Sequence, residues 1–250
     1  MELTWKISDK DVTGVRSVVG QYKNTPLVRY RVKVNLAKQK PLISRDRFWR
    51  ALAGSLLTTQ QKSGPTSAVS RFIKARPYPI PYKTCRDEPR LESFLRKTMS
   101  QFGGIRFSTK IAAELAANLA KLEAGEWSET LRRVNLLTEP ATSEAERDVA
   151  EYLDTRLKGL GPKQSRNLLQ GLGLTRFEIP IDSRITKWLN RNGFPVHLGA
   201  AALGDRNYYH FVSEGVQRLC QAADVAPCVF DAAVFASFDK TSWSEDIAGW

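Results

Sequence analysis

The sequence predicts a mostly helical protein that begins with a short β element. Residues 25–34 alternate apolar with basic or polar side chains, which is the period of a half-exposed strand, so two or three strands are expected within residues 1–40. From Arg45 onward the apolar residues recur at helical spacing. With 250 residues the chain is long enough to bury a substantial hydrophobic core.

Capping residues and glycines set the expected limits of several helices in the second half of the chain. Ser108 is expected to cap a helix, and Ser143-Glu144-Ala145-Glu146 has the form of a capping box. Asp182 and Asp205 also stand directly before helical patterns, and Pro227 is suited to a first helical position. The expected helices cover residues 108–122, 143–157, 183–192, 205–223 and the segment from 227 onward.

The charge balance indicates a polyanionic partner. The net charge is +12 at pH 7 and the sequence pI is about 9.8. Such a charge favours salt-sensitive binding to a polyanion, although it can also serve solubility alone. The basic residues are spread from Arg45 to Arg191, which predicts a basic face on a folded protein and not a disordered tail.

The cysteines and histidines show no metal-binding pattern. Cys85, Cys220 and Cys228 are too widely spaced for a zinc or iron–sulfur site, and we expect them to be buried apolar side chains. His197 and His210 are not at ligand spacing, so neither a metal nor another cofactor is expected. No apolar run approaches the roughly 20 residues of a membrane span, and no secretory leader precedes the first polar residues. These features predict a cytoplasmic protein.

The segment Leu157-Lys158-Gly159-Leu160-Gly161-Pro162-Lys163 is the most informative part of the chain. A hydrophobic-Gly-hydrophobic-Gly turn between two helices is typical of a DNA-binding helical hairpin. Gly159 and Gly161 leave the backbone bare, so the amides at the start of the second helix can approach a phosphate oxygen. Pro162 suits the first helical position, which places Lys163 beside the bound phosphate.

Lys163 is followed nineteen residues later by Asp182, in Ile179-Pro180-Ile181-Asp182. This segment resembles the catalytic segment of the helix-hairpin-helix DNA glycosylases, in particular the bifunctional branch that includes 8-oxoguanine DNA glycosylase and endonuclease III. The resemblance implies a hairpin at about residues 144–171 within a two-lobed helical region, 41–250. It also implies a monomer that binds double-stranded DNA carrying a modified base or an abasic site.

Three other segments resemble the same family in the right order: residues 48–61, 103–110 and 227–238. The resemblance implies that Gln60 or Gln61 fills the gap left by an extruded nucleotide. It implies a base pocket lined from the last helix, with Phe230, Asp231 and Phe235 as candidates. Alternatively, the two glutamines only form the turn at a helix end, and the three residues of the last helix are ordinary core residues.

Lys163 and Asp182 suffice for glycosylase chemistry without a metal. An amine can attack C1′, displace the base and form a Schiff base, while a carboxylate stabilises positive charge on the sugar. The amine must be neutral, and the helix N-terminus together with Lys158 and Arg166 is expected to lower its pKa. Lys158 and Arg166 are also candidate DNA contacts, together with Gly159 and Gly161.

Three functions remain open from the sequence. The first is a bifunctional glycosylase and abasic-site lyase with Lys163 as nucleophile and Asp182 as stabiliser, acting on an oxidised purine such as 8-oxoguanine. The second is a glycosylase that only removes a base, which includes a bulky modified base of invading DNA; Asp182 then activates water and Lys163 holds a phosphate. The third is a hairpin protein that binds DNA without catalysis, in which Asp182 is only a helix cap.

Overall fold

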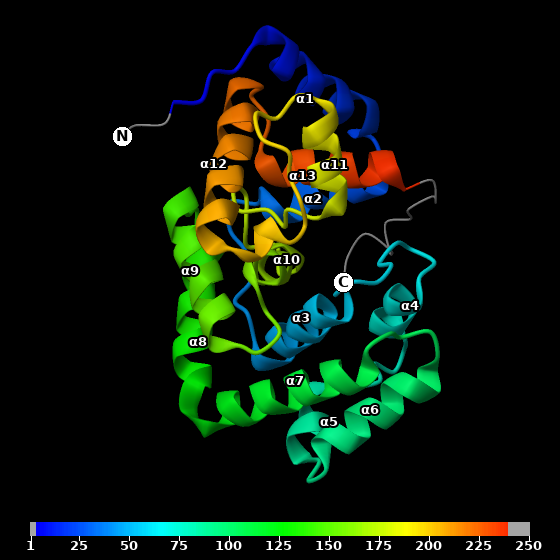
Figure 1. The fold of residues 1–250 in the computed structure, drawn as a ribbon. Coiled ribbons are helices and arrows are strands. Elements are labelled where there is room, and N and C mark those ends of the chain that lie inside the picture. Colours follow the sequence, from blue (N-terminus) through cyan, green and yellow to red (C-terminus); the bar gives the residue numbers. More distant parts are fainter. Residues whose placement is uncertain (1–3, 240–250) are drawn as a thin grey trace.

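The computed structural model describes residues 4–239, and this part of the chain is built from helices with no strands (Figure 1). The α-helices are α1 (Asp9–Tyr22), α2 (Pro26–Asn35), α3 (Arg45–Leu57), α4 (Ala68–Lys74), α5 (Tyr82–Asp87), α6 (Leu91–Phe102), α7 (Ser108–Lys121), α8 (Trp127–Asn135), α9 (Ser143–Arg156), α10 (Pro162–Gly171), α11 (Ser183–Arg191), α12 (Arg206–Ala222) and α13 (Pro227–Phe238). Short π- and 3-10 segments lie at Leu122–Glu126, Leu136–Thr138 and Ala202–Gly204.

Two hydrophobic clusters divide the described residues into two lobes. The first lobe is formed by α3 to α10, with the fully buried Phe48, Trp49 and Phe72 among its largest side chains. The second lobe combines α1 and α2 with α11, α12 and α13, around Tyr209 and Phe230. The two ends of the described chain therefore pack together, and α10 lies where the lobes meet (Figure 1).

The predicted N-terminal β element is wrong, because residues 26–35 form helix α2. Thr25 has the extended backbone of an N-cap, and Pro26 occupies the first turn, where its missing amide costs nothing. The alternation of apolar residues that gave the strand period does not correspond to burial, since Leu27, Val28 and Asn35 are buried while Val32 is 44% exposed. The buried face of α2 packs against α13, and α1 packs against α13 as well. Residues 9–35 therefore belong to the second lobe.

Most of the predicted helix starts are confirmed, with two shifts in the cap. Asp205 caps α12 by accepting a hydrogen bond from the Tyr208 amide at 2.8 Å, and Pro227 begins α13. The cap of α9 is Thr142 and not Ser143, because Thr142 Oγ1 accepts from the Ala145 amide. Ser108 is the first residue of α7 and not its cap; the preceding Phe107 has a left-handed backbone with φ 58°.

The helical hairpin is present between α9 and α10. Leu157 and Leu160 are buried and anchor the connecting turn, while Gly159 has φ 78°. A Cβ atom at Gly159 would also lie 2.5 Å from a carboxylate oxygen of Glu114, so both the backbone angle and the space favour glycine. Gly161 is the extended N-cap of α10, and Pro162 follows it at the first helical position, as predicted.

Two further sequence predictions concern the burial of the cysteines and the length of apolar helices. The three cysteines are free and buried, as expected for small apolar side chains. Within residues 4–239 none of the helices is by itself long and apolar enough to cross a membrane; α12 and α13 meet that test only as a pair bent by 97°. The predicted region 41–250 includes residues 240–250, which lie outside the described residues.

Candidate active site

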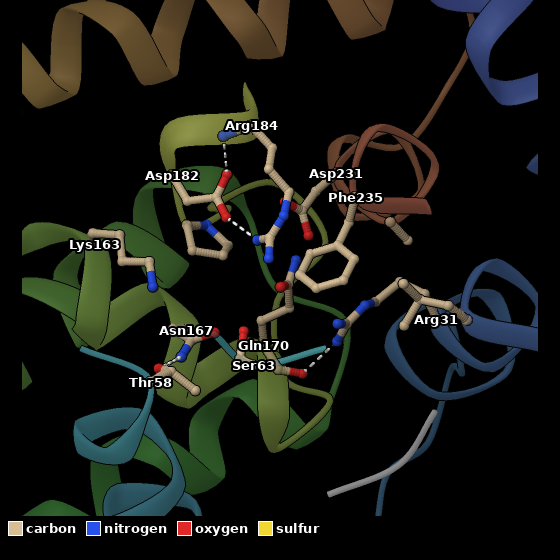
Figure 2. A pocket seen from close by; sticks show the side chains of 13 residues that line it. Arg31, Thr58, Ser63, Lys163, Asn167, Gln170, Asp182, Arg184, Asp231 and Phe235 are labelled. Atoms are coloured by element: carbon tan, nitrogen blue, oxygen red, sulfur yellow. Dashed lines mark hydrogen bonds and ion pairs between the residues drawn. The ribbon is translucent and has the colours of Figure 1, made fainter. Parts of the chain in front are cut away.

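A cavity of about 60 Å³ lies between the lobes and contains four of the predicted site residues, Lys163, Asp182, Asp231 and Phe235 (Figure 2). Its walls come from α2, α10, α11, α13 and the turn that follows α3. The lining residues are Leu27, Arg31, Thr58, Ser63, Lys163, Asn167, Gln170, Pro180, Asp182, Arg184, Asp231, Ala232 and Phe235. Lys163 and Asp182 therefore share one cavity although they lie on different helices.

Lys163 is the second residue of α10 and is half-buried. Its Nζ donates a hydrogen bond to Gln164 Oε1 at 3.2 Å, and Gln164 in turn donates to Thr59 Oγ1 at 2.6 Å. Burial lowers the pKa of the Lys163 ammonium; nearby Asp182 opposes this effect, and the Arg184 guanidinium adds to it. A larger fraction of this amine is therefore neutral at a given pH than for an exposed lysine.

Asp182 is the N-cap of α11, as the sequence predicted. Its Oδ1 accepts hydrogen bonds from the Arg184 amide at 2.8 Å and from the Ile185 amide at 3.1 Å. Its Oδ2 accepts a further hydrogen bond from the Arg184 guanidinium, which closes an ion pair (Figure 2). Three donors thus hold the carboxylate rigidly at the edge of the cavity.

The last helix contributes two of its three predicted pocket residues. Asp231 and Phe235 line the cavity, four residues apart on one face of α13. Asp231 is 7% exposed, and burial raises the pKa of its carboxyl to about 7. Phe230 is fully buried and packs edge-on against Trp188 with ring centroids 4.9 Å apart, so it belongs to the core of the second lobe and not to the cavity.

The two glutamines of the turn after α3 do not line the cavity. Gln61 is held by the loop before α7, because its Oε1 accepts from the Arg106 amide at 2.9 Å and its Nε2 donates to the Leu57 and Arg106 carbonyl oxygens. Gln60 is exposed and has a left-handed backbone with φ 50°. Of the two side chains, Gln60 is the one exposed on the surface.

The predicted contact between Arg166 and DNA is contradicted by the structure. Arg166 is fully buried, its Nε donates to Glu178 Oε2 at 2.8 Å, and its guanidinium lies 4.9 Å from the centre of the Tyr209 ring. Arg184, and not Arg166 or Lys158, is the cation that lowers the Lys163 pKa. Lys158 and Gly159 are exposed on the hairpin turn, where a phosphate can reach them.

Several cavity residues were missed in the sequence. Arg31 was assigned to a strand, so its place on the cavity face of α2 was not recognised. Thr58 and Asn167 hydrogen-bond to each other across the cavity floor, at 3.0 Å, and only the packing of α3 on α10 brings them together. Arg184 could have been predicted, since a basic residue two positions after a capping aspartate can reach its carboxylate.

In the described residues no group of three or more histidines, cysteines or acidic residues is arranged to hold a metal ion.

The fold is similar to that of 8-oxoguanine DNA glycosylases of known structure. At 15% sequence identity, the 8-oxoguanine DNA glycosylase of Thermotoga maritima superposes with a TM-score of 0.64 over 93% of this chain and 98% of its own. The Methanocaldococcus jannaschii 8-oxoguanine DNA glycosylase gives 0.67 at 15% identity over 92% and 95% of the two chains. A structure of the Methanocaldococcus enzyme with a 15mer DNA containing 8-oxoguanine gives 0.68 at 16% identity over 91% and 98%. No protein-family model matches the sequence, and neither does any of the curated proteins compared with it.

Proposed function

We propose that this protein is a DNA glycosylase with an associated abasic-site lyase activity, and that Lys163 is its nucleophile. One observation carries the proposal: a half-buried lysine with a lowered pKa stands at the start of the second hairpin helix and shares a cavity with a rigidly held aspartate. The similarity of the fold to 8-oxoguanine glycosylases supports the same class of reaction.

The chemistry follows from the neutral Lys163 amine. Its nitrogen forms a bond to C1′ of the target nucleotide while the N-glycosidic bond breaks and the base leaves with the electron pair. The sugar ring then opens, O4′ takes a proton, and a Schiff base joins Lys163 to C1′. Loss of a proton from C2′ breaks the C3′–O bond and releases the 3′ phosphate. The lowered pKa of Lys163 increases the fraction of enzyme ready for the first step.

Asp182 supplies negative charge to the developing positive charge on the sugar. Its orientation is fixed by the two backbone amides of α11 before any substrate arrives, so little reorganisation is needed in the transition state. The ion pair with Arg184 neutralises part of that charge in the free protein. We infer that Arg184 moves away from Asp182 when a nucleotide occupies the cavity.

DNA is expected to bind first through its backbone. The turn at Gly159 and Gly161 exposes the amides at the start of α10 to a phosphate, and Lys158 adds a positive charge beside them. A free cavity of about 60 Å³ leaves little room, so an extruded base enters as the Arg184 side chain makes space. An oxidised purine is the leading candidate substrate. The reason is that a structurally similar enzyme, from Methanocaldococcus jannaschii, was crystallised with DNA containing 8-oxoguanine.

A second candidate is a glycosylase without lyase activity. It is favoured by the hydrogen bond that directs Lys163 Nζ to Gln164, toward Thr58 and away from Asp182 (Figure 2). In that mechanism Asp182 activates a water molecule and Lys163 binds a phosphate. A bulky modified base of invading DNA is then as suitable a substrate as an oxidised purine, and a catalytically silent binder is the remaining alternative.

The test presents the purified protein with duplexes that contain a panel of modified bases, led by 8-oxoguanine, and with a duplex that contains an abasic site. We expect release of at least one base and cleavage of the abasic strand. Asp182→Asn keeps a side chain that can cap α11, so it should preserve the fold and slow base release by orders of magnitude. If the wild-type protein neither releases a base nor cuts abasic DNA, it is a DNA-binding protein without this activity.

A further inference from the structure

Two carboxyl groups line the cavity, and their surroundings differ sharply. Asp182 accepts hydrogen bonds from two backbone amides and pairs with the Arg184 guanidinium, and it lies at the edge of the cavity. Asp231 is buried on α13 beside the apolar Ala232 and Phe235, and burial together with the nearby Asp182 charge raises its pKa to about 7, against the opposing effect of Arg31. A buried carboxyl group with a raised pKa, placed in the same cavity as a carboxylate held by three donors, is suited to act as an acid.

We propose that Asp231 protonates the departing base. This inference rests on the proposed glycosylase function and adds a catalytic residue to it. Asp231 and Phe235 share one face of α13, so a base stacked on the Phe235 ring presents its edge to the Asp231 carboxyl (Figure 2). Most residues of α13 are buried, which fixes the position of this helix in the second lobe.

The proton transferred from Asp231 neutralises the negative charge that the base gains in the first chemical step. As the N-glycosidic bond breaks, the base takes its electron pair, and the O–H bond of Asp231 breaks to place a proton on a ring nitrogen of that base. Asp231 is left as a carboxylate and is reprotonated from water after the base departs. Gln170 lines the same cavity, and its side chain interacts with the Asp231 carboxyl group, which places an amide beside the proposed acid.

The charged and titratable groups around Asp231 come from several helices. They are Arg31 of α2, Lys163 of α10, Asp182 and Arg184 of α11, Tyr209 of α12 and Cys228 of α13. Burial raises the pKa of the Tyr209 and Cys228 side chains, so both are neutral near pH 7. The protonation of Asp231 therefore depends on two arginines, one lysine and one carboxylate, and an incoming base that displaces Arg184 favours the protonated acid.

The proposal gives base release a pH dependence with a defined sign. Asp231 acts in its protonated form, so the rate of base release falls as pH rises through about 7. Lys163 acts in its neutral form, so the rate rises with pH until that amine has lost its proton. Cleavage of a preformed abasic site needs Lys163 but has no leaving base, and it should therefore lack the decrease near pH 7.

The test compares the wild-type protein with Asp231→Asn on 8-oxoguanine DNA and on abasic DNA between pH 5 and about 9 in single-turnover assays. Asp231→Asn keeps the side-chain shape and its hydrogen-bonding capacity but carries no transferable proton. We expect base release to slow by about 100-fold at low pH, with the decrease above neutral pH removed. Cleavage of abasic DNA, which has no leaving base to protonate, should be slowed far less than base release by the same substitution.

Two results would overturn the proposal while leaving the glycosylase function intact. One is a variant that loses affinity for the modified base but keeps the wild-type pH profile, which makes Asp231 a binding residue. The other is a wild-type rate of base release that is flat through neutral pH, a measurement that does not depend on the folding of any variant. Wild-type protein inactive on every duplex would instead refute the proposed function.

Discussion

The guanidinium carbon of Arg184 lies 3.8 Å from the centre of the Phe235 ring, while the same guanidinium pairs with Asp182. Arg184 therefore covers one face of the Phe235 ring and pairs with the carboxylate that the proposed reaction would use. The Arg184 side chain thus contacts both Phe235 and Asp182, which line the same cavity. Under the proposed function, a flipped nucleotide would have to replace this contact in order to stack on Phe235.

Arg184→Met should make base capture easier. Methionine keeps a flexible stem on Phe235 but removes the cation–π contact, worth about 0.5–2 kcal/mol, that an entering base has to displace. The population of extruded base should rise several-fold, as reported by the fluorescence of 2-aminopurine placed beside the target base. Unchanged or lower fluorescence would show that Arg184 does not close the cavity.

Gln60→Ala should weaken base extrusion without weakening the fold. Gln60 is exposed at a left-handed turn position, where it can enter the space vacated by a nucleotide. The same 2-aminopurine signal should fall, while binding to undamaged duplex stays the same. Gln61→Ala is the matched control, because its side chain holds the Arg106 loop and its loss should instead lower the melting temperature. Equal signals in the wild-type protein and Gln60→Ala would leave this turn with a structural role.

Lys158→Ala should change the salt dependence of DNA binding. If Lys158 contacts one phosphate, its removal should reduce the slope of log affinity against log salt by about 1, similarly for all duplex sequences. Lys10→Ala, an exposed lysine on α1 away from the hairpin in Figure 1, should leave the slope unaltered. A wild-type affinity that is flat between ~50 and ~200 mM salt would refute backbone binding altogether.

Arg166→Met should reduce stability and spare DNA binding. The substitution leaves Glu178 buried, although Arg147 and Gln217 still contact its carboxylate. Breaking one partner of a buried pair costs about 3–5 kcal/mol, and these remaining contacts place the expected loss in the free energy of unfolding near the lower limit. Urea unfolding measures the loss, and DNA affinity of the folded variant should equal that of the wild-type protein. Weakened DNA binding at full stability would restore Arg166 as a DNA contact.

Local signals predicted the parts of the site that depend on neighbouring residues in the chain. The Gly-Leu-Gly turn, Pro162 at the start of α10 and Asp182 as a cap each follow from a few adjacent residues, and the structure confirms these geometries. The N-terminal helices were missed because the alternating pattern outweighed the start signal at Thr25 and Pro26. Burial in α2 depends on its packing against α13, at the opposite end of the described chain, and such a distant contact leaves no signal in the local sequence.

Electrostatic properties of the site were the least predictable from sequence. The raised pKa of Asp231 comes from burial and from the Asp182 charge, which only the assembled cavity provides. Arg166 was predicted to contact DNA, yet Glu178 and Tyr209 enclose it in the core. Charged residues in sequence therefore indicated a DNA partner but did not identify which of them reach its surface.

Borohydride trapping tests the central claim most directly, since it reports whether Lys163 forms a covalent bond to C1′. Wild-type protein mixed with a duplex that it processes should give a stable protein–DNA adduct when the Schiff base is reduced. Lys163→Gln should give none, and Lys10→Gln, which changes an exposed lysine on α1, should give as much adduct as the wild-type protein. Base release by the wild-type protein without any adduct, or an adduct that persists in Lys163→Gln, would contradict the assignment of Lys163 as the nucleophile.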